Sequence, residues 1–159
     1  MTLPDIVIRI ILVTILAGLV GLDRELKHKP AGAKTHMLVG IGSTLFMMVS
    51  IYIYLQYKGA DTQVDPGRIA AQVVTGIGFL GAGTIIQARG AVYGLTTAAS
   101  LWVVAGIGLA VGAGMYGAAL VTTVMILLIF AVINRLSMLV ESKVKKRGAR
   151  KRKKGSSRG

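Results

Sequence analysis

Few side chains in this sequence of 159 residues could carry out chemistry. There are two histidines, His28 and His36, six acidic residues and no cysteine. The missing thiol excludes a disulfide framework, thiolate metal sites and cysteine catalysis. The histidines flank a basic loop without a third ligand at metal spacing, and no carboxylates are paired inside an apolar segment. General acid–base and nucleophilic catalysis lack their usual groups, so we expect no enzyme and no cofactor or metal.

The first candidate cluster is Asp23, Arg24 and Glu25, at the end of the first apolar segment. It could dock a partner or sense an ion, joined across helices to Arg68 or Lys34. The alternative is an ordinary helix end, in which each carboxylate pairs with the lysine four residues further on for a few tenths of a kcal/mol. Both interpretations stay open.

A second candidate set is Arg68, Gln72 and Thr75, which share one face of a predicted helix. Asp65 precedes them as an acidic N-cap, with a proline in the first turn. The set could line a polar cleft or receive a partner helix. Alternatively, Arg68 extends toward the headgroups and Gln72 makes an interhelical hydrogen bond worth about 0.6–2 kcal/mol.

Two further polar sets favour a structural interpretation. Thr96, Thr97 and Ser100 are predicted to cap a helix and to hydrogen bond between helices. Asp5 and Arg9 lie one helical turn apart, so we expect the carboxylate to neutralise an arginine that would otherwise be costly in a membrane.

The segment from Gly76 to Gly81 matches the dinucleotide motif G-x-G-x-x-G. That motif needs a preceding strand and an acidic residue about 20 positions later, and this sequence supplies neither. We therefore expect its small residues to allow close helix packing, as does the pair spaced G-x-x-x-G in the next span. The glycines in question are Gly76, Gly78, Gly81 and Gly83, with Gly108 and Gly112 as the pair.

Composition places these residues in a membrane protein. Hydrophobic residues make up 53% of the chain and charged residues 16%, with a mean hydropathy of +0.68. A soluble domain has about a quarter charged residues. Five apolar stretches approach the roughly 20 residues that cross a bilayer: Pro4 to Gly21, Met37 to Leu55, Arg68 to Gln87, Leu95 to Val111 and Tyr116 to Ile133. We predict an all-α integral membrane protein with a bundle of about five transmembrane helices.

The net charge of +13 divides unevenly along the chain. Residues 142–159 hold ten basic and no acidic residues, whereas residues 1–141 have a net charge of +3. We predict a transmembrane domain over 1–141 and a disordered basic tail over 142–159. Basic residues favour the cytoplasmic side, which places the N-terminus outside and the C-terminus inside. The tail is expected to bind anionic lipid headgroups, and nucleic acid is not an expected partner.

Four linked motifs resemble the MgtC/SapB family of membrane proteins. They are Gly21-Leu-Asp-Arg-Glu25, Pro30-Ala-Gly-Ala-Lys-Thr-His36, the run from Asp65 to Gly83, and Gly94-Leu-Thr-Thr-Ala-Ala-Ser-Leu-Trp102. The resemblance implies a five-span inner-membrane protein tied to magnesium limitation, acid tolerance and, in pathogens, virulence. It also implies that these proteins regulate other membrane proteins. Many relatives carry a soluble C-terminal domain, and the 26 residues after Ile133 are too few for one.

Two functions remain in competition. The first is a non-enzymatic regulator that contacts another membrane protein, or a second copy of itself, through its helices. The second is a magnesium or other cation transporter or channel component, as older naming of the family suggests. Magnesium favours carboxylates, and all six acidic residues fall at span ends or in connections. The regulator is therefore the preferred prediction.

Overall fold

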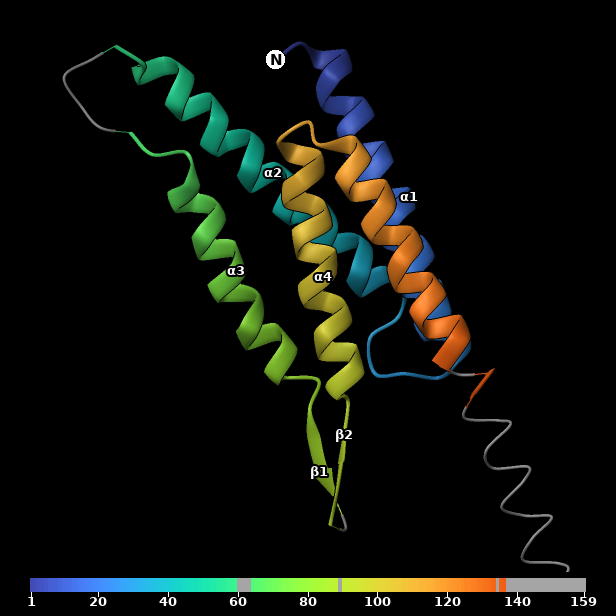
Figure 1. Ribbon diagram of the computed structural model, residues 1–159. Coiled ribbons are helices and arrows are strands. Elements are labelled where there is room, and N and C mark those ends of the chain that lie inside the picture. The colour runs from blue at the N-terminus through green and yellow to red at the C-terminus, as the bar shows by residue number, and fades with distance from the viewer. Residues whose placement is uncertain (60–63, 89, 134, 137–159) are drawn as a thin grey trace, which may run out of the picture. The chain divides into compact units, whose positions relative to one another are not determined.

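The computed structural model describes residues 1–59, 64–88, 90–133 and 135–136 (Figure 1). The helices are α1 (Leu3–Leu26), α2 (Ala33–Tyr57), α3 (Gly67–Ala82), α4 (Leu95–Gly112) and a further helix, Tyr116–Ile133; the strands are β1 (Ile86–Ala88) and β2 (Ala91–Tyr93). All but α3 are long and apolar enough to cross a membrane, which confirms the predicted all-α membrane fold. The chain divides into two units, Met1–Ile126 and Leu127–Gly159, and the packing below belongs to the first.

Helices α1 and α2 form a close antiparallel pair. A Cβ atom added at Gly21 would lie 2.6 Å from the Cα of Ala33, so the two backbones touch where the chain turns back. Further along, a Cβ at Gly40 would lie 3.0 Å from side-chain atoms of both Val13 and Ala17. Glycine at these positions allows an approach that a larger residue would prevent.

Helices α2 and α4 run parallel to one another. His36 bonds Ser100, and Thr44 bonds Gly108, each across a separation of 64 residues. A constant separation means that both helices advance in the same direction. A Cβ at Gly108 would lie 2.5 Å from the carbonyl oxygen of Gly40. Gly112, one turn later, lies similarly close to α2, which confirms the close packing predicted for this G-x-x-x-G pair.

Helix α3 is shorter than predicted. The third span was expected to continue to Gln87, but α3 ends at Ala82 and an antiparallel hairpin of β1 and β2 follows. Glycines weaken the helix at its end. Isoleucine, valine and tyrosine then favour strands on either side of Gly90, whose φ is +78°. Because α2 and α4 run parallel, the chain returns through α3, which runs antiparallel to both.

The structure corrects the predicted ion pair between Asp5 and Arg9. The Asp5 carboxylate accepts hydrogen bonds from the backbone and hydroxyl of Thr2 at the start of α1. Arg9 instead donates to the carbonyls of the last two residues of α4, and its guanidinium lies 5.7 Å from the ring centre of Tyr116. The partial negative charge of the α4 C-terminus therefore stabilises the charge of this arginine. The reversal beyond α4 turns at Gly114 with φ +81°, within the predicted segment.

Candidate functional site

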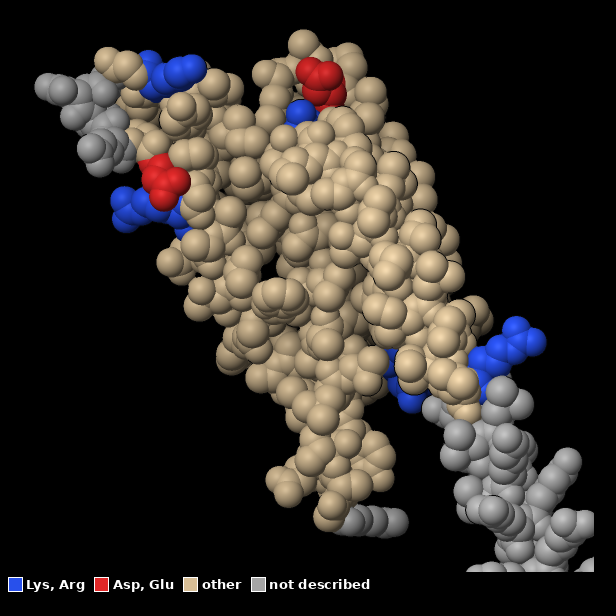
Figure 2. Space-filling view, viewed as in Figure 1, with Lys and Arg blue, Asp and Glu red and all other residues tan. Residues whose placement is uncertain are grey.

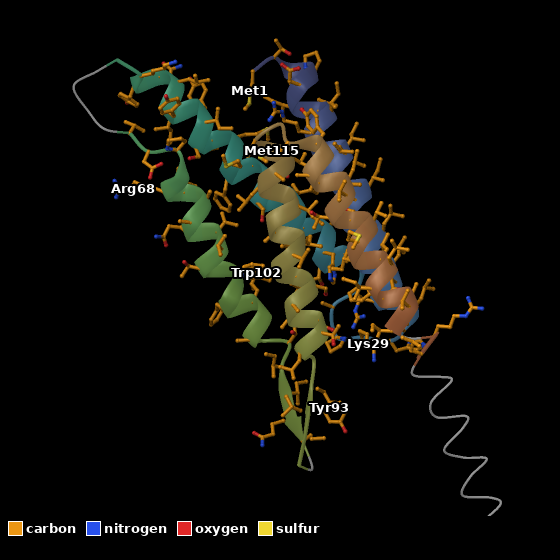
Figure 3. All side chains as sticks on the ribbon, in the orientation of Figure 1. Met1, Lys29, Arg68, Tyr93, Trp102 and Met115 are labelled. Atoms are coloured by element: carbon orange, nitrogen blue, oxygen red, sulfur yellow. The ribbon has the colours of Figure 1, made fainter. Side chains whose placement is uncertain are left out.

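Charged side chains lie at the two ends of the first unit, and the flank in Figure 2 carries none between them. Lys29 and Arg68 mark opposite ends in Figure 3. Arg68 is exposed at the start of α3, whereas Asp23 lies near the end of α1. The predicted link between Arg68 and the acidic cluster is therefore wrong. The sequence showed that both sets were polar, but the antiparallel course of the helices separates them.

The Asp23 cluster forms a compact helix end. Asp23 pairs with Lys27 at 2.5 Å, as the alternative structural interpretation predicted, and lies 3.9 Å from Arg24. Arg24 is only 4% exposed, so its charge sits inside the bundle. A buried guanidinium requires nearby hydrogen-bond acceptors. The conformation of this helix end therefore depends on the side chains around Arg24.

Glu25 has a different partner from the one expected. It was expected to pair with Lys29, but its carboxylate accepts a 2.8 Å hydrogen bond from the backbone N–H of Ala33. This bond caps the first turn of α2, where free N–H groups favour an anion. Lys34, the other predicted member of the cluster, is exposed.

His36 is a buried residue that sequence reasoning assigned to a loop. Its side chain is fully buried in α2, with Nδ1 2.8 Å from the Gly32 carbonyl and Nε2 2.9 Å from the Ser100 hydroxyl. Ser100 also donates to the Thr97 carbonyl, and the Thr97 side chain is buried. The predicted interhelical role of Ser100 is confirmed. No local signal in the sequence marks this burial, because any residue four positions before a histidine supplies a backbone carbonyl.

Two predicted helix caps have different outcomes. The residue before α4 is Gly94, with φ +89°, so Thr96 does not cap this helix and is exposed within its first turn. A left-handed backbone at this position suits glycine, which explains why no threonine occupies it. The N-cap of α3 is Pro66 and not Asp65 as predicted. The Asp65 carboxylate nevertheless accepts a 2.7 Å hydrogen bond from the N–H of Gly67, the first residue of α3.

A groove lies between α2 and α3, next to the predicted polar face. Its volume is about 610 Å³ and its lining is mainly apolar. It is lined by Thr35, Leu38, Val39, Gly42, Ser43 and Phe46 from α2, and by Ile69, Gln72, Val73, Gly76, Ile77 and Leu80 from α3. We call this hollow the α2–α3 groove. It brings together two of the predicted residues, Gln72 and Gly76.

The rest of the predicted α3 set lies elsewhere. Arg68 and Thr75 are not among the lining residues, and the Thr75 hydroxyl donates to the carbonyl of Ala71 in its own helix. The glycines of α3 also depart from the expected close packing within the chain. Added Cβ atoms at Gly76 and Gly78 would meet nothing within 4 Å.

Two other glycines near the end of α3 have close neighbours. A Cβ at Gly81 would lie 3.6 Å from the Ala98 side chain, whereas one at Gly83 would meet only carbonyls of its own helix. The expected approach to another helix therefore occurs at Gly81 and not at Gly83. The open positions are the two glycines nearer the middle of α3.

Two other predictions concern metal and the tail. In the part of the chain that the structure describes, no three His, Cys, Asp or Glu side chains form a potential metal site. The basic tail, residues 142–159, lies outside the described residues, as does the boundary at residue 141.

These features define a class: a multi-pass membrane protein with a packed α1–α2–α4 core and an apolar groove beside α3. The sequence profile of the MgtC family matches residues 10–139. The chain belongs to this family, as the MgtC/SapB resemblance predicted.

Curated relatives show the same membership. YhiD of Escherichia coli (strain K12), named as a candidate magnesium transporter, is 45% identical over 140 residues, covering 87% of this chain and 65% of YhiD. SapB of Bacillus subtilis (strain 168) is 39% identical over 127 residues, covering 79% of this chain and 55% of SapB. MgtC of Brucella abortus (strain 2308) is 40% identical over 135 residues, covering 85% of this chain and 54% of MgtC.

The chain thus spans between 54% and 65% of the length of these relatives. No solved structure matches it.

Proposed function

We propose that this chain is a non-enzymatic protein of the inner, cytoplasmic membrane that modulates another membrane protein through helix–helix contact. The expected setting is adaptation to magnesium limitation or acid stress, linked to virulence in pathogens, as the family resemblance implies. The observation that carries the proposal is the α2–α3 groove, a hollow of about 610 Å³ beside the open glycine positions of α3.

The physical support comes from how helices associate in lipid. Apolar surface alone gives helices little reason to leave lipid, so association depends on close packing at small residues and on interhelical hydrogen bonds. Gly42 and Gly76 line opposite walls of the groove, and a Cβ at either would meet nothing within 4 Å. Thr35 and Gln72 supply polar groups in the same lining. A partner helix would thus find both features in one place.

The test is to fill the groove from each wall. Gly42→Leu and Gly76→Leu should each abolish co-purification of a specific partner in mild detergent from cells grown at low magnesium. Gly117→Leu is the matched control, because Gly117 also faces open space but lies outside the groove. Mass spectrometry of the co-purified proteins would measure the loss. Equal partner yields from all three variants, or no specific partner with the unchanged protein, would refute the proposal.

Magnesium transport is the second candidate, favoured by the name of YhiD. The decisive assay is magnesium flux into liposomes that contain only the purified protein. We expect flux no higher than in protein-free liposomes. Flux that depends on the protein and is blocked by Gly76→Leu would replace the regulatory proposal with transport through the groove.

The basic tail is proposed to contact anionic headgroups. Each basic residue near an anionic leaflet contributes at most about 1 kcal/mol. Salt-sensitive binding of the tail peptide to phosphatidylglycerol vesicles, and not to neutral ones, is the expected result.

A further inference from the structure

The hairpin between α3 and α4 is an exposed apolar element with a tight neck. All six strand residues are exposed, with Ile86 at 55% and Tyr93 at 58%. At the neck, a Cβ added to Gly94 would lie 1.8 Å from the Thr84 carbonyl oxygen. The two ends of the hairpin therefore approach each other closely at its neck.

The length of α3 fixes the depth at which the hairpin begins. Sixteen residues span about 24 Å at 1.5 Å per residue. The hydrocarbon core is about 30 Å thick, so an upright α3 falls short by about 6 Å. About two extended residues cover that distance. With the start of α3 at one boundary of the hydrocarbon, the strands begin near the other boundary.

The backbone between α3 and β1 suits this depth. The N–H groups of Gly83, Thr84 and Ile85 donate to the carbonyls of Phe79, Gly81 and Ala82, respectively. Unpaired backbone groups are costly in hydrocarbon, and these three are paired. Beyond them, a two-stranded ladder leaves its outer edges unpaired and in need of water or headgroup oxygens. The change from paired to unpaired backbone thus coincides with the start of the strands.

The two faces of the hairpin differ in character. The register pairs Ile86 with Tyr93 and Gln87 with Val92. Because paired residues share a face, Ile86 and Tyr93 lie on one face, and Gln87 lies on the other beside Val92. Tyrosine is enriched at membrane interfaces, where its ring contacts the acyl boundary and its hydroxyl reaches water. The Ile86–Tyr93 face is the side suited to lipid.

We propose that the β1–β2 hairpin is an interfacial anchor whose Ile86–Tyr93 face lies against the boundary between headgroups and acyl chains. The occupant is the phospholipid itself, because Phe79 and Leu95 of the adjoining helices are also exposed apolar side chains. The sequence also contains no Asp or Glu from Pro66 to Val140, so nothing there repels anionic headgroups. The anchor compensates for the shortness of α3.

The test uses spin labels in this cysteine-free chain. Single labels at Tyr93→Cys and Gln87→Cys would be compared in liposomes of phosphatidylethanolamine and phosphatidylglycerol, from the ratio of oxygen to nickel-complex accessibility. Lys29→Cys, in the exposed α1–α2 connection, is the water reference, and Val121→Cys, on an exposed apolar helix face, is the lipid reference. The ratio at Tyr93 should lie between the two references and several-fold above that at Gln87.

Other results would overturn the anchor. A Tyr93 ratio equal to that at Lys29 would place the hairpin in water, and one equal to that at Val121 would place it fully in hydrocarbon. Equal ratios at Tyr93 and Gln87 would show that neither face prefers lipid. Protection of Tyr93 in native membranes but not in liposomes would assign the face to a protein partner.

If the cysteine variants fail to fold, tryptophan fluorescence provides a second test. Tyr93→Trp in a Trp102→Phe background leaves one tryptophan, since Trp102 is the only one in the chain. Shallow brominated lipids should quench it most strongly. No quenching by lipids at any depth would also overturn the proposal.

Discussion

The α1–α2–α4 core and helix α3 use the same kinds of residue with opposite results. In the core, Gly21, Gly108 and Gly112 bring backbones together; at Gly108 an added Cβ would lie 2.5 Å from a carbonyl of α2. In α3, Gly76 and Gly78 face open space. Small residues in a membrane helix therefore indicate close approach only when another helix is present to fill the gap. Among the described residues nothing fills the space beside Gly76 and Gly78, which is why these two glycines support a proposal about a second protein.

The largest effect should come from filling the core contact. Gly108→Val should destabilise the protein by about 3 kcal/mol, the upper end of the usual range for overpacking, because the neighbouring backbone cannot move aside as a flexible side chain could. Gly106→Val is the control, since Gly106 lies on the same helix with nothing within 4 Å. Thermal unfolding in detergent would measure both. Equal melting temperatures would remove the contrast between packed and open glycines.

The next effect tests how the core is closed at the end of α4. Arg9→Gln should cost about 1.5–3 kcal/mol, the range for hydrogen bonds made by a charged group. Asp5→Asn serves as the comparison, because the carboxylate bonds Thr2 and not Arg9. Its effect should be smaller and independent of Arg9. A strong coupling between the two in a double-mutant cycle, measured by unfolding, would restore the ion pair that the sequence suggested.

A smaller effect is expected for the buried polar contact between α2 and α4. A double-mutant cycle with His36→Ala and Ser100→Ala should give a coupling energy of about 0.6–1.7 kcal/mol, as for other interhelical hydrogen bonds in membranes. Thr35→Val, at an exposed neighbouring position, should show no coupling with Ser100→Ala. Unfolding in detergent again provides the measurement. A coupling indistinguishable from zero for His36 and Ser100 would mean that shape alone joins these helices.

The smallest effect is expected on α3. Gly76→Ala should change stability by no more than about 1 kcal/mol, in the stabilising direction, because alanine is the better helix former and a Cβ there meets nothing. Equilibrium unfolding of this variant beside the unchanged protein would measure it. A clear loss of stability would show that α3 packs more closely than the groove implies. The contrast between open glycines in α3 and packed glycines in the core would then fail.

Most of the helices could be predicted from the sequence because each is a long apolar stretch, and a hydropathy profile detects such stretches directly. It overestimated α3 because Ile85 and Ile86 are as apolar as the helix before them, and hydropathy does not distinguish a strand from a helix. It missed the burial of His36, since a histidine among basic residues is typical of a loop. The pairing of Arg9 with α4 depends on a contact 102 residues away, which no local pattern contains.

The parallel alignment of α2 and α4 has a consequence for how the protein is made. The partners of His36 and Thr44 lie 64 residues later in the chain. At 5–20 residues per second, synthesis of that stretch takes roughly 3–13 s. During this interval α1 and α2 are already made, but the side chains of His36 and Thr44 have no α4 to bond. The insertion machinery, water or lipid headgroups must therefore supply partners to the α1–α2 pair until α4 is made.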